Sequence, residues 1–203
     1  MYEKLGLLDF YRGRRVLVTG HTGFKGSWLS LLLLRLGAQV IGFSLDPYTS
    51  KDNFVVTGLS KRVVDLRGDV RDYRKLSAVM DEYRPEIIFH LAAQPIVRLS
   101  YDLPRETVET NVMGTANVLE AFRRSEAAKT LIVITSDKVY ENKEWVWGYR
   151  ENDPLGGYDP YSASKAAAEL IVSAYTRSFF NPKDHAQHGK AVATVRAGNV
   201  IGG

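Results

Sequence analysis

The chain has 203 residues, of which 45% are hydrophobic and 25% are charged, and it contains no cysteine. This composition is typical of a globular protein, and the lack of cysteine excludes disulfides, zinc–thiolate sites and a thiol nucleophile. The formal net charge of +4 comes without a run of like charges, which argues against nucleic acid and membrane surfaces as partners. We expect no signal peptide, no membrane span and a cytoplasmic location.

Short apolar runs that are typical of buried strands alternate with longer segments of helical periodicity. We predict strands over residues 15–19, 39–43, 62–66, 86–91, 130–135 and 191–196. Helices are predicted over residues 26–36, 73–83, 104–124 and 160–180, with a polar, aromatic loop over 138–159. Apolar strands separated by helices indicate a parallel sheet covered on both faces, which here predicts an α/β, doubly wound Rossmann fold.

The first predicted strand leads into a glycine-rich turn that opens the first predicted helix. Gly20, Gly23 and Gly26 follow the spacing G-x-x-G-x-x-G, one residue wider at its start than the common dinucleotide fingerprint. Gly20 permits a tight turn, Gly23 lets the backbone approach a pyrophosphate, and Gly26 lets the helix pack closely on the strand. The helix N-terminus adds free N–H groups and a partial positive charge. These features predict a dinucleotide site.

Two acidic residues follow the next two predicted strands. Asp46 comes 20 residues after Gly26, just past the second strand. There a carboxylate accepts hydrogen bonds from a ribose 2′-hydroxyl and repels a 2′-phosphate, which favours NAD over NADP. Asp69 follows the third strand, where it either faces an adenine amino group or is an ordinary residue of a surface turn.

A second group of polar residues predicts a catalytic site. Tyr161 and Lys165 lie one helical turn apart on the same helix face. A cation at that distance stabilises a phenolate and lowers the pKa of the tyrosine, which a tyrosine base needs at neutral pH. Ser136, Asp137 and Lys138 end the fifth strand, at the edge where doubly wound sheets place their ligands. We therefore expect a hydroxyl, a carboxylate and an amine to converge beside the tyrosine.

Several segments resemble the extended short-chain dehydrogenases/reductases, in particular the NAD-dependent epimerase/dehydratase group and its members that dehydrate CDP-glucose. They are residues 20–28, 90–95, 111–115, 135–140, 145–152, 156–161 and 196–203. Ser136, Tyr161 and Lys165 match the Ser/Thr–Tyr–Lys triad of that family. The resemblance covers essentially the whole chain and implies NAD as the cofactor and a nucleoside-diphosphate sugar, CDP-glucose, as the substrate.

The resemblance also assigns positions to ligands and partners. The cofactor-binding positions that it implies are Gly20, Thr22, Gly23, Phe24, Lys25, Gly26, Asp46, Asp69, Val70, Leu91, Ala92, Ala93, Asn111, Tyr161 and Lys165. The implied substrate-binding positions are Gln94, Arg98, Ser136 and Asn199. The predicted helices 104–124 and 160–180 resemble the pair through which this family forms homodimers. We expect no metal site, because the segment around His185 and His188 is typical of a solvated loop.

The implied reaction is an internal oxidation, dehydration and reduction of the sugar. Tyr161 would remove the proton of the 4-hydroxyl as the C4 hydride passes to NAD⁺, water would leave across C5–C6, and the hydride would return to C6. Ser136 would bond the O4 region, Lys165 would hold the ribose, and Asp137 would protonate the leaving 6-hydroxyl. Lys138 departs from the pattern, because relatives acting on thymidine-linked sugars carry Glu there. It would act as a neutral base or stabilise an enolate.

Two other functions stay open. One is a sugar-nucleotide 4-epimerase, or a dehydratase for a different nucleoside-diphosphate sugar. An epimerase would share Tyr161 and Lys165 without needing Asp137 and Lys138. The other is a non-catalytic, regulatory NAD-binding protein, which would have no use for the triad. The resemblance implies a smaller C-terminal substrate domain, and we expect residues 1–203 to be the NAD-binding domain alone.

Overall fold

The computed structural model of the chain describes residues 6–202, and its centre is a parallel six-stranded sheet. The strands are β1 (Arg15–Thr19), β2 (Gln39–Ser44), β3 (Val64–Arg67), β4 (Ile87–His90), β5 (Thr130–Ile134) and β6 (Ala191–Val195). Their order is β3-β2-β1-β4-β5-β6, and all neighbours pair in parallel. This order confirms the predicted doubly wound fold, because the chain reverses its direction across the sheet between β3 and β4.

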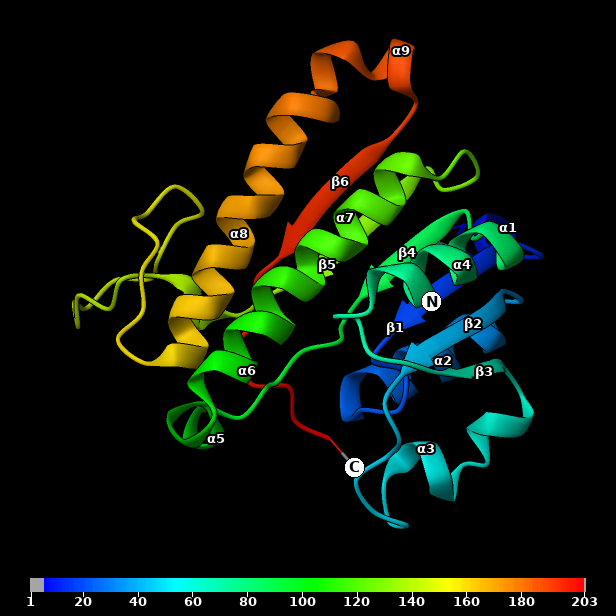
Figure 1. Cartoon of the computed structure of the whole chain (residues 1–203), viewed down its shortest axis with the longest axis horizontal. Coiled ribbons are helices and arrows are strands. Elements are labelled where there is room, and N and C mark those ends of the chain that lie inside the picture. The colour runs from blue at the N-terminus through cyan, green and yellow to red at the C-terminus, as the bar shows by residue number, and fades with distance from the viewer. Residues whose placement is uncertain (1–5, 203) are drawn as a thin grey trace.

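Helices lie on both faces of the sheet. One face carries α4 (Tyr73–Tyr83), α7 (Gly114–Arg124) and α8 (Pro160–Phe179), and α2 (Phe24–Arg35) covers the other face beside β1 and β2. Figure 1 shows α7 and α8 running side by side along the sheet. Leu17 and Val18 are adjacent in β1 and belong to the two different cores, which explains why the central strands are apolar at every position.

The predicted helix over residues 104–124 is continuous but not uniform. It consists of α6 (Pro104–Val108), a π-helical segment η3 (Glu109–Met113) and α7. Pro104 stands in the first turn, where its missing N–H is not needed. Side-chain periodicity predicts the helix but does not reveal the π segment, which buries Asn111 at its centre. Such segments often occur at functional sites.

The remaining elements are short. They are α1 (Leu7–Tyr11), α3 (Asn53–Val56), η2 (Leu59–Lys61), α5 (Val97–Asp102), η4 (Asp137–Val139), η5 (Pro182–Asp184) and α9 (His185–His188). The segment around His185 and His188 forms two helical turns rather than an irregular loop, and His188 Nε2 lies 3.0 Å from Asn181 O. In residues 6–202 no cluster of His, Asp and Glu has the arrangement of a metal site. Nor does any helix there combine the length and the apolar character of a bilayer span.

Candidate functional site

The glycine loop connects β1 to α2 at the carboxyl edge of the sheet. Gly20 has a φ of +75°, and a Cβ atom there would lie 2.7 Å from Ala92 N. A Cβ on Gly26 would collide with the carbonyl oxygen of Gly20. Gly23, which has no side chain, is the N-cap of α2, so the N–H groups of the first turn face outward for a ligand. The loop therefore fits a pyrophosphate, as the spacing predicts.

Two side chains of the loop hold it against the neighbouring strands. The Thr22 hydroxyl lies 2.7 Å from Ser44 Oγ and donates to Leu45 O at 3.0 Å. His21 is fully buried, and its Nε2 lies 2.8 Å from Asp65 Oδ1. Thr22 is a predicted cofactor position, whereas His21 is not. The Thr22 contacts fix the loop to the carboxyl end of β2, and the His21 contact fixes it to β3.

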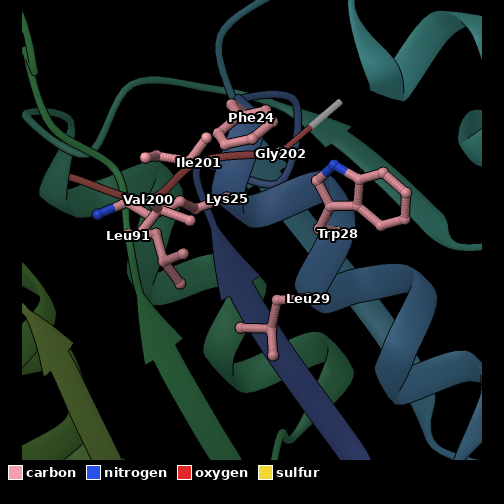
Figure 2. A pocket seen from close by; sticks show the side chains of 8 residues that line it. All are labelled: Phe24, Lys25, Trp28, Leu29, Leu91, Val200, Ile201 and Gly202. Carbon is pink, nitrogen blue, oxygen red and sulfur yellow. The ribbon is translucent and has the colours of Figure 1, made fainter. Parts of the chain in front are cut away.

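A cavity of about 360 Å³ opens beside the start of α2 (Figure 2). Its lining residues are Phe24, Lys25, Trp28, Leu29, Leu91, Val200, Ile201 and Gly202. Phe24, Lys25 and Leu91 are predicted cofactor positions. Trp28 was not predicted as a site residue, although it belongs to one of the segments that carry the resemblance.

The two predicted nucleotide acids are both paired with arginines. Asp46 is exposed just after β2, and its Oδ1 lies 3.1 Å from Arg67 Nε. Asp69 Oδ2 accepts from Arg71 Nη2 at 2.6 Å. Burial acts to raise the pKa of Asp69, but hydrogen bonds from Arg71 outweigh it and lower that pKa. Val70, the next predicted cofactor position, is buried.

The predicted cofactor positions after β4 are Leu91, Ala92 and Ala93, and all three are partly buried. The N–H groups of Leu91 and Ala92 donate to Thr19 Oγ1, both at 3.2 Å. His90, at the end of β4, is buried with its ring nitrogens 2.7 Å from Thr19 Oγ1 and 3.1 Å from Thr115 Oγ1. Burial, together with the charge of Lys165, lowers the pKa of His90 to about 3. This histidine is thus a neutral structural link between β1 and α7.

The sequence predicts Gln94 and Asn111 to bind ligands, but in the structure their amides bond to other groups of the protein. Gln94 N donates to Asn111 Oδ1 at 2.8 Å, and Asn111 Nδ2 donates to Gln94 O at 3.1 Å and to Ser164 Oγ at 2.9 Å. Gln94 Nε2 donates to Thr107 Oγ1 at 2.9 Å. In this structure both residues therefore position the segment after β4 against η3 and α8.

The predicted catalytic residues converge where β5 ends and α8 begins. Ser136 Oγ donates to Asp137 Oδ1 at 3.1 Å, and Lys138 Nζ donates to the same oxygen at 3.2 Å. Lys138 Nζ also donates to Asn199 Oδ1 at 3.4 Å, which brings this predicted substrate residue into the group. Burial raises the pKa of Tyr161, while a hydrogen bond with Ser136 and the charge of Lys138 partly oppose it. The pKa of Tyr161 is thus raised overall, whereas the sequence predicts that it is lowered.

Lys165 connects the catalytic group with the glycine loop. It is buried one turn after Tyr161, and its Nζ donates to Ile134 O at 3.4 Å. Burial and the charge of Lys25 lower the pKa of Lys165 to about 8. Because Lys25 belongs to the glycine loop, the predicted cofactor and catalytic sites are neighbours in the fold.

Arg98 lies on α5, outside the group of side chains around Asp137. Its side chain is exposed, and α5 packs against α8. Ser100 of the same helix accepts a hydrogen bond at 3.2 Å from the backbone N–H of Tyr161. The element that carries Arg98 is therefore tied to the start of α8.

A buried ion pair beside the predicted catalytic residues is absent from the sequence predictions. The Arg196 guanidinium donates to both carboxylate oxygens of Glu169, from Nε and Nη2, each at 3.0 Å. Thr135 Oγ1 donates to Glu169 Oε1 at 2.6 Å. Burial acts to raise the pKa of Glu169, but the bonds from Arg196 and Thr135 outweigh it and lower that pKa. The position of Glu169, one turn after Lys165, is the sequence signal that could have pointed to it.

The fold and the site define a class of protein. The chain has a Rossmann sheet, a glycine loop after β1 and a Ser–Tyr–Lys triad at the end of β5 and the start of α8. This is the arrangement of the extended short-chain dehydrogenases/reductases. The sequence profile of one family, described as GDP-mannose 4,6 dehydratase, matches residues 17–182. The chain belongs to this family.

Three known proteins show what the chain is similar to in sequence and in structure. It is 56% identical over 195 residues to a CDP-glucose 4,6-dehydratase of Salmonella typhimurium, covering 96% of this chain and 54% of the relative. A UDP-glucose 4-epimerase of Thermus thermophilus, solved in complex with NAD, is 30% identical with a TM-score of 0.73, covering 90% and 54%. A dTDP-glucose 4,6-dehydratase of Bacillus anthracis, also solved with NAD, is 26% identical with a TM-score of 0.71, covering 91% and 53%. The chain thus spans about half the length of the relatives that it matches.

Proposed function

We propose that this protein is a sugar-nucleotide 4,6-dehydratase that converts CDP-glucose to CDP-4-keto-6-deoxyglucose, with NAD as a bound cofactor. The observation that carries the proposal is the contact of 3.2 Å between Lys138 Nζ and Asp137 Oδ1 beside Tyr161. An epimerase needs one group that removes the proton of the sugar 4-hydroxyl and later returns it. A dehydratase also needs a proton acceptor for C5 and a donor for the leaving hydroxyl, and this pair supplies both. The 56% identity to a CDP-glucose 4,6-dehydratase supports the choice of substrate.

The residues of the glycine loop fit NAD. The outward N–H groups at the start of α2 and the side chain of Lys25 would hold the pyrophosphate, and Asp46 would accept from the adenosine ribose. Lys165 would bond the nicotinamide ribose. When bound, NAD supplies a group that takes a hydride from C4 of the sugar and returns it to C6.

Tyr161 takes the proton of the sugar 4-hydroxyl, and Ser136 holds the same oxygen by a hydrogen bond. Because burial raises the pKa of Tyr161, its phenolate requires positive charge nearby. The charge of Lys138 supplies part of it in the ligand-free protein. Once the substrate covers Lys138, the buried Lys165, one turn away on the same helix, is the cation that remains beside the phenolate. The tyrosine therefore becomes a base only when the surrounding groups are all in place.

Asp137 and Lys138 exchange one proton between them. Lys138 Nζ and Asp137 Oδ1 lie 3.2 Å apart, and both side chains are about half-exposed. When a substrate covers the pair and removes water, desolvation favours the neutral forms, so a proton passes from Lys138 to Asp137. Neutral Lys138 then takes the C5 proton while Asp137 gives its proton to the leaving 6-hydroxyl, which departs as water. The charged lysine and ionised carboxylate are thereby restored.

The test is incubation of the full-length protein with NAD and CDP-glucose, followed by mass spectrometry of the sugar nucleotide. We expect a product that has lost one water and carries a keto group. Tyr161→Phe should abolish the product and leave NAD binding intact. Turnover of UDP-glucose to UDP-galactose without loss of water would overturn the proposal in favour of an epimerase. NAD binding without turnover of any sugar nucleotide would favour the regulatory alternative.

We also propose that two copies pair through the helices 104–124 and 160–180. Val108, Met113 and Leu170 are large apolar residues that are exposed along these helices, and a homodimer would cover them. Analytical ultracentrifugation should find a dimer that Leu170→Glu dissociates. A monomer in the unaltered protein would contradict this pairing. We propose in addition that the protein is cytoplasmic and that residues 1–203 form its NAD-binding domain.

A further inference from the structure

A chain of polar contacts leads from the buried His21 of the glycine loop to the surface. It starts at His21 Nε2, which lies 2.8 Å from Asp65 Oδ1. The other oxygen of Asp65 accepts from Arg67 Nη2 at 2.9 Å. Arg67 Nε then lies 3.1 Å from Asp46 Oδ1. The acid that we expect to bind the adenosine ribose is therefore in contact with a guanidinium group.

Arg67 is held on several sides, whereas Asp46 is not. The guanidinium of Arg67 lies over the Phe54 ring, 5.0 Å from its centroid, and its Nη1 donates to Leu45 O at 3.3 Å. The side chain of Arg67 is 34% exposed and that of Asp46 is 85% exposed. Asp46 can therefore move away while the guanidinium stays in place.

The inner end of the chain of contacts is rigid. His21 is buried, its ring packs edge-on against Phe54 at 5.3 Å, and a Cβ atom on Gly42 would collide with it. Burial lowers the pKa of His21, so the ring is neutral at pH 7. Asp65 is thus left to pair with Arg67. The two carboxylates of Asp46 and Asp65 share one guanidinium.

We propose that Arg67 is a second determinant of the choice between NAD and NADP, acting as a preformed ligand for a 2′-phosphate that Asp46 keeps occupied. This inference rests on the proposed dinucleotide site. A ribose whose 2′-position contacts Asp46 also lies within reach of Arg67, because the two side chains are in contact. A guanidinium binds phosphate through two parallel hydrogen bonds. Asp46 excludes the phosphate in two ways: its negative charge repels the phosphate, and its carboxylate occupies Arg67 Nε, one of the nitrogens that would donate to it.

The proposal makes the effect of Asp46 depend on Arg67. Removing the carboxylate alone frees a guanidinium that is already oriented by Phe54, Leu45 and Asp65. Removing both side chains takes away the repulsion without supplying a ligand. If Arg67 served only to attach β3 to the loop after β2, its loss would weaken NAD and NADP equally. The ratio of the two affinities separates the two roles, and protein stability does not.

The experiment measures the Kd values of NAD⁺ and NADP⁺ by calorimetry for the full-length protein and for Asp46→Ser, Arg67→Met and the double variant. The unaltered protein should prefer NAD⁺. Asp46→Ser should shift the ratio of affinities toward NADP⁺ by about tenfold or more, the size of a charge-assisted bond. Most of that shift should disappear in the double variant. Arg67→Met alone should increase the preference for NAD⁺.

Two further variants control the result. Arg62→Met, also in the Asp46→Ser background, removes an arginine that precedes β3 and should leave the ratio unchanged. Arg67→Lys in the Asp46→Ser background keeps the positive charge but loses the two parallel N–H donors of the guanidinium, so it should retain only part of the shift. This variant replaces Arg67→Met in the test if Arg67→Met fails to fold. Equal affinity ratios for Asp46→Ser and the double variant would overturn the role of Arg67. Failure of the unaltered protein to bind either dinucleotide would overturn the proposed function, and this inference with it.

Discussion

The two ends of the candidate site use arginine–carboxylate pairs in opposite ways. On the cofactor side, Arg67 and Asp46 are 34% and 85% exposed. On the catalytic side, Arg196 and Glu169 are 17% and 5% exposed, and the guanidinium binds both carboxylate oxygens. An exposed pair contributes little to stability and can open for a ligand, whereas a buried pair cannot lose one partner without leaving an unpaired charge.

This difference corresponds to what each end has to do. The pair of Arg67 and Asp46 belongs to the dinucleotide site that we propose. The pair of Arg196 and Glu169 joins the ends of β5 and β6 to α8 through Thr135, beside the residues that we propose to be catalytic. We interpret the first as a ligand-exchanging contact and the second as a fixed support for Ser136 and Tyr161.

The largest effect is expected from breaking the buried pair. Arg196→Met leaves the Glu169 carboxylate buried without its partner, so the free energy of unfolding should fall by about 3–5 kcal/mol. Urea denaturation measures this loss. The double variant Arg196→Met/Glu169→Met should recover part of it, because no charge remains buried. The exposed Arg177 on α8 is the matched control, since Arg177→Met should change stability by less than about 0.5 kcal/mol. Equal losses at Arg196 and Arg177 would contradict the contrast.

The next effect concerns the packing of the glycine loop. Gly26→Ala places a methyl group against the carbonyl oxygen of Gly20, which should cost about 1–3 kcal/mol of stability and weaken NAD binding. Thermal denaturation and a dinucleotide titration give the two readouts. Gly148→Ala is the control, because a Cβ atom there meets no atom within 4 Å. Unchanged NAD affinity in Gly26→Ala would show that the loop does not hold the cofactor.

A pH dependence is expected from His90, which lies between the two ends. Its folded-state pKa of about 3 is below the usual value of 6.5, so its contribution to stability is complete above pH 6.5 and decreases as the pH falls. Between pH 6.5 and 5 the slope should reach up to about 1.4 kcal/mol per pH unit from this group. Denaturation at several pH values should show a smaller slope in His90→Gln. An unchanged slope would mean that His90 titrates normally.

The smallest effect is expected at the exposed pair. Arg67→Met and Asp46→Ser should each change the free energy of unfolding by less than about 1 kcal/mol, even though they change the preference between dinucleotides. A double-mutant cycle on stability should give a coupling energy in the same small range. A coupling energy as large as that of the buried pair would remove the distinction between the two ends.

The sequence predicts the parts of the site that depend on neighbouring residues. Gly20, Gly23 and Gly26 lie within one loop, and Tyr161 and Lys165 within one helical turn, so their spacing defines their geometry. The order of the six strands also follows, because parallel apolar strands joined by helices allow few topologies.

What the sequence does not predict depends on contacts between distant elements. Glu169 and Arg196 belong to α8 and the end of β6, and their pairing appears only when these are packed together. Gln94 and Asn111 are residue types that often bind ligands. Once buried, however, their amides have to find partners within the protein: the Asn111 amide bonds the backbone of Gln94, and the Gln94 amide bonds Thr107. The pKa of Tyr161 likewise depends on burial, which spacing alone does not report.

The π segment Glu109–Met113 has a consequence for how this chain tolerates insertions and deletions. A π turn closes on i→i+5 and takes up one residue more than an α turn, so a deletion within the segment would make the helix regular and keep its two halves in register. The second half places Val118 and Leu119 in the core, and the segment itself places Asn111 against Gln94 and Ser164. A deletion that keeps the first placement would tighten the π turn and displace Asn111 from its partners. The number of residues in this helix is therefore under the same constraint as the identity of Asn111.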